Sequence, residues 1–200
     1  MQLAGLIGLG GVFLAQIFAQ TAAAQTLVGD PAAGRQKAGV CRTCHGLDGY
    51  AKIPIAPHIG GEHPAYILHQ LTAFRSGARV HEMMSVVAAG LDDQAIADLA
   101  AWYGSQTVVA TLPDGMTEDA APQACVACHG AEGLAQIEDA PNLAGENVIY
   151  IDTQLKAFRT GKRKHEIMSE IAAGLSDAEI RAFAGWYGAT GITISPPAQP

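Results

Sequence analysis

The stretch CRTCHGLDG, residues Cys41–Gly49, contains the pattern C-x-x-C-H, and the stretch CVACHGAEG, residues Cys125–Gly133, contains it a second time. All four cysteines of the 200-residue chain lie in these two stretches. The similarity extends further: residues 41–104 align with residues 125–188 at a constant shift of 84 positions, and 34 of the 64 aligned residues are identical. The chain is therefore a duplication of one small domain.

Turn-forming residues mark the ends of the two copies. The segment between them contains Pro113, the pair Asp114-Gly115 and Pro122, residue types that are typical of loops. Beyond the second copy, the last ten residues include three prolines. We therefore expect a first domain, a linker, a second domain and a loose tail, over residues 25–108, 109–117, 118–190 and 191–200.

Each copy has the apolar spacing of short helices. In the first copy, Ile67, Leu71 and Phe74 recur at helical intervals. Pro64 suits the first turn of this helix, and Gly77 suits its end. The second copy repeats the pattern, and no segment shows the period-two alternation of a half-buried strand. The sequence predicts an all-α fold, in which loops rich in glycine and proline wrap a large buried group.

The C-x-x-C-H pattern is the attachment signature of c-type haem. Two thiols three residues apart on a helical turn can each form a thioether with a haem vinyl group, and the next residue then lies under the iron. A haem would also supply the apolar interior that a domain of about 80 residues with few aromatic side chains lacks. The sequence therefore predicts two covalently bound haem c groups. The attachment residues are Cys41, Cys44, Cys125 and Cys128, and His45 and His129 each fill one axial position.

Three other uses of the cysteines fit the sequence less well. A tetrahedral zinc site could take four thiolates, but paired zinc ligands usually lie closer together in the chain, and each histidine would have no role. A thiol redox motif usually lies in a βαβ unit, and no strand pattern is present. Two disulfides of this spacing would close small, strained loops.

The second axial ligand is expected from a residue type that both copies share. Met84 aligns with Met168, whereas the adjacent Met83 aligns with Ile167. We therefore expect Met84 and Met168 as iron ligands, and Met83 as a residue that fills core space. Methionine raises the potential of a haem iron relative to a second histidine.

Other residues repeated in both copies are candidates for supporting roles. His81 and His165 align with each other and compete with the methionines as iron ligands. A ligating histidine usually donates its second N–H to a carbonyl, and Pro57 and Pro141 follow the two motifs at the same distance. Four arginines recur and could neutralise haem propionates: Arg75, Arg79, Arg159 and Arg163.

The N-terminal residues have the composition of a secretory signal. Residues 3–19, LAGLIGLGGVFLAQIFA, form an apolar run, which the small residues Thr21–Ala24 follow. We expect a signal peptide over residues 1–24, with cleavage after Ala24, and a periplasmic location. The run is borderline for a membrane-spanning helix, which needs about 20 residues, so a retained segment would anchor the protein.

The net charge of −7 is unevenly shared between the two copies. Residues 25–108 carry a net charge of −1, and residues 109–200 carry −6. An acidic chain of this kind is a poor partner for nucleic acid, so none is expected. The two halves would present different docking faces to an electron donor and an electron acceptor.

Several blocks of the sequence resemble those of one known family, the dihaem cytochromes c4. The blocks are C-x-x-C-H-G, the loop APxxxG, HPAYILHQLTAFRSG and HEMMSVVAAGLDDQAIADLAAWYG, and the resemblance covers about residues 31–188. It implies two tandem class I cytochrome c domains, with axial pairs of His45 with Met84 and His129 with Met168. The chain departs from the family before each methionine, where it has His-Glu-Met and His-Glu-Ile and the family more often has Asn-Pro-x.

The resemblance implies an electron carrier rather than an enzyme. Such a carrier is periplasmic, often associates with the membrane, and shuttles single electrons between respiratory-chain partners. A quinol-oxidising complex or a dehydrogenase would be the donor, and a terminal oxidase the acceptor. Two alternatives stay open. One is the cytochrome subunit of a periplasmic dehydrogenase, of the flavocytochrome c sulfide dehydrogenase or alcohol dehydrogenase type, and the other, with less support, is a dihaem peroxidase.

Overall fold

The computed structural model describes residues 27–197, so the expected signal peptide over residues 1–24 lies outside the described residues. The helices of the first copy are α1 (Pro31–Lys37), η1 (Ala38–Val40), α2 (Arg42–His45), α3 (Pro64–Ser76), α4 (Glu82–Ala89) and α5 (Asp93–Gly104). Those of the second copy are η2 (Glu118–Ala120), α6 (Gln123–His129), α7 (Val148–Arg159), α8 (Glu166–Ala173) and α9 (Asp177–Ala189). The strands are β1 (Thr107–Thr111) and β2 (Gly191–Ser195). No helix in this part of the chain has the length and apolar character needed to cross a membrane.

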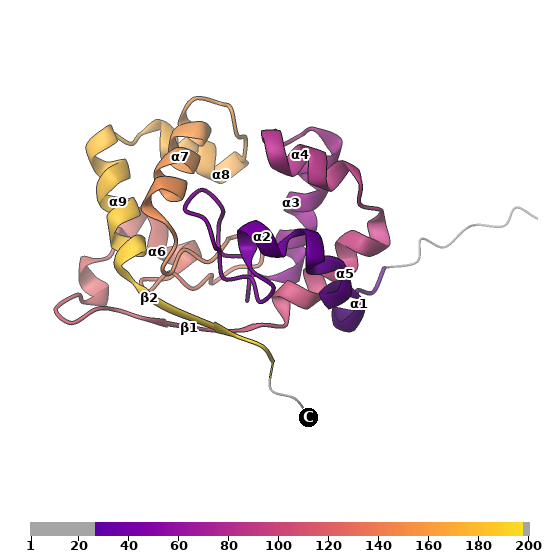
Figure 1. The fold of residues 1–200 in the computed structure, drawn as a ribbon. Helices are drawn as coiled ribbons and strands as arrows, with labels where there is room; N and C mark the ends of the chain where they lie inside the picture. The colour runs from indigo at the N-terminus through magenta and orange to yellow at the C-terminus, as the bar shows by residue number, and fades with distance from the viewer. Residues whose placement is uncertain (1–26, 198–200) are drawn as a thin grey trace, which may run out of the picture.

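Each copy folds as its own helical domain (Figure 1). In the first domain, α5 packs against α1 and α3, and α3 also contacts α4. In the second domain, α7 packs against both α8 and α9. This arrangement confirms the predicted pair of small, mainly helical domains, and it leaves long loops between α2 and α3 and between α6 and α7.

The start and the end of α3 follow from its sequence. Pro64 occupies the first turn, and the His63 side chain accepts a hydrogen bond from a backbone N–H of that turn. Gly77 ends the helix with a φ of 79°, a left-handed conformation that favours glycine. Ile67 and Phe74 face the interior and are buried. The predicted helix is therefore confirmed.

The last helix of each domain fastens the loop that follows the C-x-x-C-H motif. Trp102 donates through Nε1 to the Leu47 carbonyl at 2.8 Å. Tyr103 is 1% exposed and donates through its hydroxyl to the Gly46 carbonyl at 3.4 Å. The second domain repeats both contacts 84 positions later. The packing of α5 and α9 thus holds the two motifs in place.

β1 and β2 form an antiparallel pair that joins the ends of the two domains (Figure 1). We expected a linker over residues 109–117 and a loose tail over residues 191–200. Both expectations are corrected, because residues 109–111 belong to β1 and residues 191–195 form β2. The strands are equivalent segments of the two copies, and Val109 pairs with Thr193, its own copy equivalent. Among the described residues, neither strand pairs within its own domain, so this sheet forms only where the two copies meet.

One buried carboxylate fixes α1, a helix that the second copy lacks. Asp98 of α5 is 2% exposed. It accepts hydrogen bonds from the Asp30 N–H at 2.9 Å, from Lys37 Nζ at 2.7 Å and from Gln94 Nε2 at 2.8 Å. The bonds from Asp30, Lys37 and Gln94, in this order of importance, lower the pKa of Asp98 to about 2. The second copy has Ala182 at the aligned position.

Asp98→Ala is expected to lower the free energy of unfolding by about 2–3 kcal/mol, because buried donors lose their acceptor. Denaturant unfolding measures this loss. The folded state lowers the pKa of Asp98, so its contribution is present above pH 3.8 and is lost as the pH falls through about 2. The control is Asp152→Ala, which breaks only an i,i+4 pair with Lys156 and is expected to cost about 0.5 kcal/mol or less. Equal losses in both variants would contradict the assignment.

Candidate haem sites

A glycine ends the helix of each C-x-x-C-H motif and turns the chain sharply. Gly46 follows α2 with a φ of 74°, and Gly130 follows α6 with a φ of 71°. A Cβ at Gly46 would lie 2.4 Å from the Tyr50 carbonyl oxygen, and one at Gly130 would lie 2.5 Å from that of Leu134. The residue that follows each C-x-x-C-H motif is glycine because no side chain fits there.

The two motif histidines are buried and oriented alike. His45 is 8% exposed and His129 is 6% exposed. Each Nδ1 lies close to a carbonyl oxygen, that of Pro57 at 2.9 Å and that of Pro141 at 2.8 Å. A carbonyl only accepts, so each Nδ1 carries the proton and each Nε2 keeps its lone pair for a metal. The predicted hydrogen bonds from the two histidines to the proline carbonyls are confirmed.

The remaining ring nitrogens fit an iron ligand. Among residues 27–197, neither the Nε2 of His45 nor that of His129 has a hydrogen-bond partner, although both residues are buried. Burial lowers the pKa of both imidazoles, and neutral imidazole is the form that binds a metal. This donor set, next to a pair of free thiols in each domain, fits a covalently attached haem.

The thiols have the properties of attachment residues rather than of redox catalysts. All four cysteines are free and half-buried. Burial raises the pKa of Cys41, and it raises the pKa of Cys125 to about 11, whereas reactive cysteines have a lowered pKa. Within the described ranges, no group of three or more His, Cys, Asp or Glu side chains converges on one point. The four cysteines are therefore not gathered into a tetrahedral zinc site.

Met84 and Met168 occupy equivalent places at the third residues of α4 and α8. Both side chains are half-buried. Met83 is 59% exposed, and its copy equivalent Ile167 is 48% exposed. The expectation that Met83 fills core space is therefore wrong: it lies on the outer side of the first turn of α4. Of the two adjacent methionines, Met84 is the half-buried one, as is its copy equivalent Met168.

His81 and His165 serve as N-caps of the helices that carry these methionines. The Nδ1 of His81 accepts hydrogen bonds from the N–H groups of Met83 and Met84, at 3.3 and 3.4 Å. The Nδ1 of His165 accepts from the Met168 N–H at 3.3 Å. A capping side chain satisfies helix donors that otherwise have no partner. This local role explains why both histidines recur without requiring them to bind iron.

The recurring arginines divide into two kinds. Arg75 donates to the Leu91 carbonyl at 3.0 Å and pairs with Asp93, and Arg159 makes the equivalent contacts. These two arginines fasten helices and are already paired. In contrast, Arg79 and Arg163 have no carboxylate within salt-bridge distance among the described residues. They reach across the domain boundary into one shared network of neutral groups: Tyr66, Gln70, Tyr150 and Gln154.

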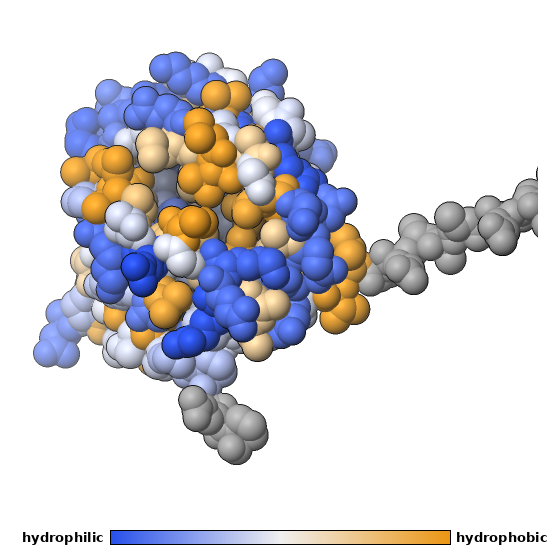
Figure 2. All heavy atoms as spheres, turned by 45° about the vertical axis from the view of Figure 1, so that its right-hand side comes forward, coloured by the Kyte–Doolittle hydropathy of each residue, from blue (hydrophilic) through white to orange (hydrophobic). Residues whose placement is uncertain are grey.

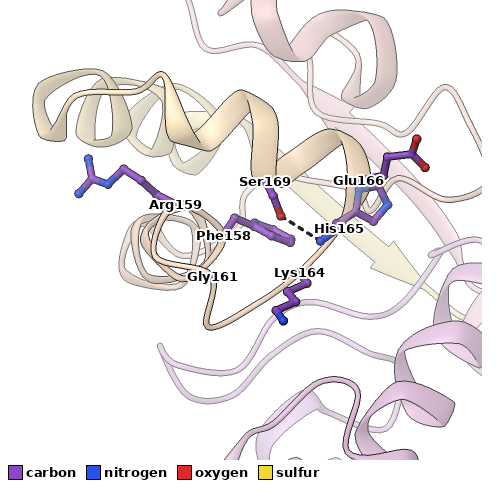
Figure 3. Close-up of a pocket in the computed structure, with 7 residues that line it drawn as sticks. All are labelled: Phe158, Arg159, Gly161, Lys164, His165, Glu166 and Ser169. Atoms are coloured by element: carbon purple, nitrogen blue, oxygen red, sulfur yellow. Dashed lines mark hydrogen bonds between the residues drawn. The ribbon is translucent and has the colours of Figure 1, made fainter.

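An open hollow of about 630 Å³ lies where α7 ends and α8 begins (Figure 3). Phe158 and His165 line it, and in Figure 3 the Ser169 hydroxyl faces the backbone N–H of His165, from which it accepts a hydrogen bond at 3.0 Å. The lining does not include His129 or a cysteine. The hollow therefore adjoins the segment that leads to Met168, but it is not the attachment site.

Comparison with known proteins places this geometry in a family. Residues 118–186 match the family described as cytochrome c oxidase, cbb3-type, subunit III. A cytochrome c4 from Thiocapsa roseopersicina is 40% identical over 179 residues, which cover 80% of this chain and 92% of the relative. The chain belongs to the cytochrome c4 family. Like other members, it is a dihaem electron-transfer cytochrome with tandem cytochrome c domains, as the sequence predicts.

Further similarities point the same way within this family. The crystal structure of reduced recombinant cytochrome c4 from Pseudomonas stutzeri superimposes with a TM-score of 0.71 and 30% identity, covering 81% of this chain and 99% of that one. A thiosulfate dehydrogenase electron acceptor from Stutzerimonas stutzeri is 33% identical over 171 residues, covering 76% of this chain and 79% of the relative. The haem groups of this family are covalently attached, which here assigns the thioethers to Cys41, Cys44, Cys125 and Cys128.

Proposed function

We propose that this chain is a periplasmic shuttle that carries single electrons between respiratory partners, with axial pairs of His45 with Met84 and His129 with Met168. The observation that carries the proposal is the same in both domains. A buried imidazole is oriented by a proline carbonyl, and its Nε2 has no partner in the part of the chain that the structure describes. A half-buried methionine lies at the equivalent place in each copy. When bound, each haem supplies a one-electron couple between ferric and ferrous iron.

The chain's own residues hold and insulate the two groups. The thioethers prevent loss of the group from the protein, and the Pro57 and Pro141 carbonyls fix the plane of each histidine. Arg79 and Arg163 bring two positive charges to the domain boundary. Among the described residues, only neutral side chains contact these charges, so both arginines suit a pairing with haem propionates. With the proposed histidine and methionine ligands in place, each haem iron would have no coordination position left for a substrate.

The intact mass of the protein from the periplasmic fraction of its host tests this proposal. We expect the mass of residues 25–200 plus two haems, stable to denaturation. A mass without haem would overturn the electron-carrier function, and a mass that retains residues 1–24 would make the protein an anchored carrier. Addition of peroxide to the purified protein is expected to give neither turnover nor a spectral change, and turnover would favour the peroxidase alternative.

A second candidate function is that of a dedicated acceptor for a periplasmic dehydrogenase. It is favoured by the 33% identity with a protein described as a thiosulfate dehydrogenase electron acceptor. Stopped-flow mixing of the oxidised protein with a reduced dehydrogenase of this class, and separately with a quinol-oxidising complex, compares the two donors. Rapid reduction by the dehydrogenase alone would favour the dedicated acceptor.

The surface beside the proposed iron ligand in the first domain suits a docking partner. Figure 2 shows apolar residues gathered among polar ones on one face of the molecule. Large exposed apolar side chains lie on and next to α4, including Val80, Met83 and Val86. Exposed apolar surface of this kind is typical of interaction sites.

The acidic second domain is expected to dock basic partners. Glu82 and Glu166 are copy equivalents at the first residues of α4 and α8, so they form a matched pair. Glu166→Gln should slow electron exchange with a basic partner protein at low ionic strength, and Glu82→Gln should slow it less, because the second domain carries most of the negative charge. Stopped-flow rates measured over a range of salt concentrations check this. Equal effects would show that the charge asymmetry does not direct docking.

A further inference from the structure

The two domains meet through the loops that follow the haem motifs, and the contacts are reciprocal. The His58 N–H donates to the Glu146 carboxylate at 2.9 Å, and His58 Nε2 lies 3.1 Å from the Gly145 carbonyl oxygen. Eighty-four positions later, the Asn142 N–H donates to the Glu62 carboxylate at 3.0 Å, and Asn142 Nδ2 donates to the Gly61 carbonyl at 3.0 Å. Each domain therefore supplies one glutamate to the other.

His58 and Asn142 are equivalent despite their different chemistry. The Ala51 N–H donates to His58 Nδ1 at 2.9 Å, and the Ala135 N–H donates to Asn142 Oδ1 at 2.9 Å. Because Nδ1 accepts here, His58 is neutral with its proton on Nε2, and burial lowers its pKa. Both side chains thus accept from their own loop and donate across the boundary, and neither brings a charge to it.

One peptide group connects each iron-binding histidine to the glutamate of the opposite domain. The carbonyl of the Pro57–His58 peptide accepts from His45 Nδ1, and the N–H of the same peptide donates to Glu146. In the second domain, the Pro141–Asn142 peptide accepts from His129 and donates to Glu62. Hydrogen bonds in series polarise one another, so an ionised glutamate strengthens the bond at the histidine.

Both glutamates are enclosed, and each is 3% exposed. Burial raises the pKa of Glu146 to about 7. Burial also raises the pKa of Glu62 well above its ordinary value, and the charge of Glu146 adds to this rise. Glu62 acts on the nearby Tyr66 hydroxyl, which Arg163, Tyr150 and Arg79 in turn surround. The other titratable groups near the pair are His58, whose N–H donates to Glu146, and His63 and Glu138, which lie with Glu62 on a groove of about 330 Å³.

We propose that Glu62 and Glu146 are positioning residues that tune the iron-binding histidine of the opposite domain, so that reduction of one domain is coupled to proton uptake by a glutamate of the other. The proposal rests on His45 and His129 being iron ligands, as in the proposed function. An ionised glutamate makes the histidine more basic through the peptide and favours ferric iron. When a redox partner gives one electron to the first domain, Glu146 binds a proton from water more tightly.

The titration of Glu146 near neutral pH gives the wild-type protein a testable asymmetry. The midpoint potential of the first domain should fall as the pH rises through 7, whereas that of the second domain should fall only at higher pH. The largest fall in potential that we expect for the first domain corresponds to a tenfold change in its ratio of reduced to oxidised protein, which is about 59 mV for one electron. Spectroelectrochemical titration of the holoprotein measures this, and a first domain that is independent of pH would overturn the proposal.

Glu146→Gln keeps an acceptor for the His58 N–H but removes the charge. It should raise the potential of the first domain and abolish its dependence on pH near 7. Because the charge of Glu146 also raises the pKa of Glu62, the pH dependence of the second domain should move to lower pH but persist. Glu62→Gln should affect the second domain instead. The control is Glu138→Gln, whose side chain is 76% exposed; it removes the same charge from the same domain as Glu146 and should shift neither potential.

Which of the two haem potentials shifts in Glu146→Gln decides between tuning across the domain boundary and an effect within the glutamate's own domain. A shift confined to the second domain in Glu146→Gln would overturn the proposal, as would an unchanged first domain. In either case two intact one-electron couples would leave the proposed function standing, whereas their absence would contradict that function itself. A second readout is the chemical shift of the His45 Nδ1 proton in the reduced protein. It should titrate with Glu146 in the wild-type protein and not in Glu146→Gln.

Discussion

Replacing Met84 with histidine will lower the reduction potential of the first domain and leave that of the second domain in place. Methionine opposite histidine raises the potential of a haem iron, whereas a second histidine lowers it. The expected shift is on the order of 0.1–0.3 V, a fraction of the roughly 0.8 V over which axial ligands set haem potentials. Spectroelectrochemical titration of the purified holoprotein measures both couples, and Met168→His should produce the reciprocal result.

The adjacent methionine provides a matched control for this prediction. Met83 is 59% exposed, so Met83→His adds the same side chain one residue away without entering the site, and both potentials should remain unchanged. A shift in Met83→His without one in Met84→His would show that alignment of the two copies identifies the wrong ligand.

The competing histidine ligand is tested by a variant that keeps its structural role. His81 caps α4 through Nδ1, and asparagine is among the best N-cap residues. His81→Asn should therefore retain the helix and leave the potential of the first domain unchanged. A large change in potential and in the ligand-sensitive absorption bands would instead identify His81 as the iron ligand.

Helix α3 and its copy α7 could be predicted because most of the residues that specify them occur in both copies. Pro64 and Gly77 delimit α3 by their backbone preferences alone, and the spacing of Ile67 and Phe74 sets its buried face. β1 and β2 could not be predicted in this way. Each strand has only five residues, and its partner lies in the other copy, so the pairing depends on how two folded domains meet rather than on either sequence pattern.

The candidate sites, like the fold, contain some contacts that local sequence predicts and others that depend on how the two domains meet. The carbonyls of Pro57 and Pro141 could be assigned because they lie at a fixed distance along the chain from the histidines that they orient. The glutamates at the boundary were missed, although Glu62 and Glu146 are identical in the two copies. An isolated glutamate in a loop is usually solvated, and only the approach of the opposite domain buries it and supplies its donor.

Removing the thioether cysteines of one domain should remove one haem and unfold that domain. Cys125→Ser with Cys128→Ser is expected to lower the mass by one haem. It should also cost the second domain about 5 kcal/mol or more, which is enough to abolish the stability of a small domain. Domains of this size depend on a cofactor or another staple because their cores of side chains are small. Mass spectrometry and far-ultraviolet circular dichroism measure the two effects.

The equivalent change in the first domain should be less damaging, because the two domains do not bury the same core. The first domain buries a contiguous cluster that includes Leu99 and Trp102, and Asp98 holds α1 against α5. The second buries a smaller cluster centred on Ile151 and Tyr187. Cys41→Ser with Cys44→Ser should therefore retain more helix than the Cys125 and Cys128 variant. Equal losses would show that haem, and not the side-chain core, supplies nearly all of the stability in both domains.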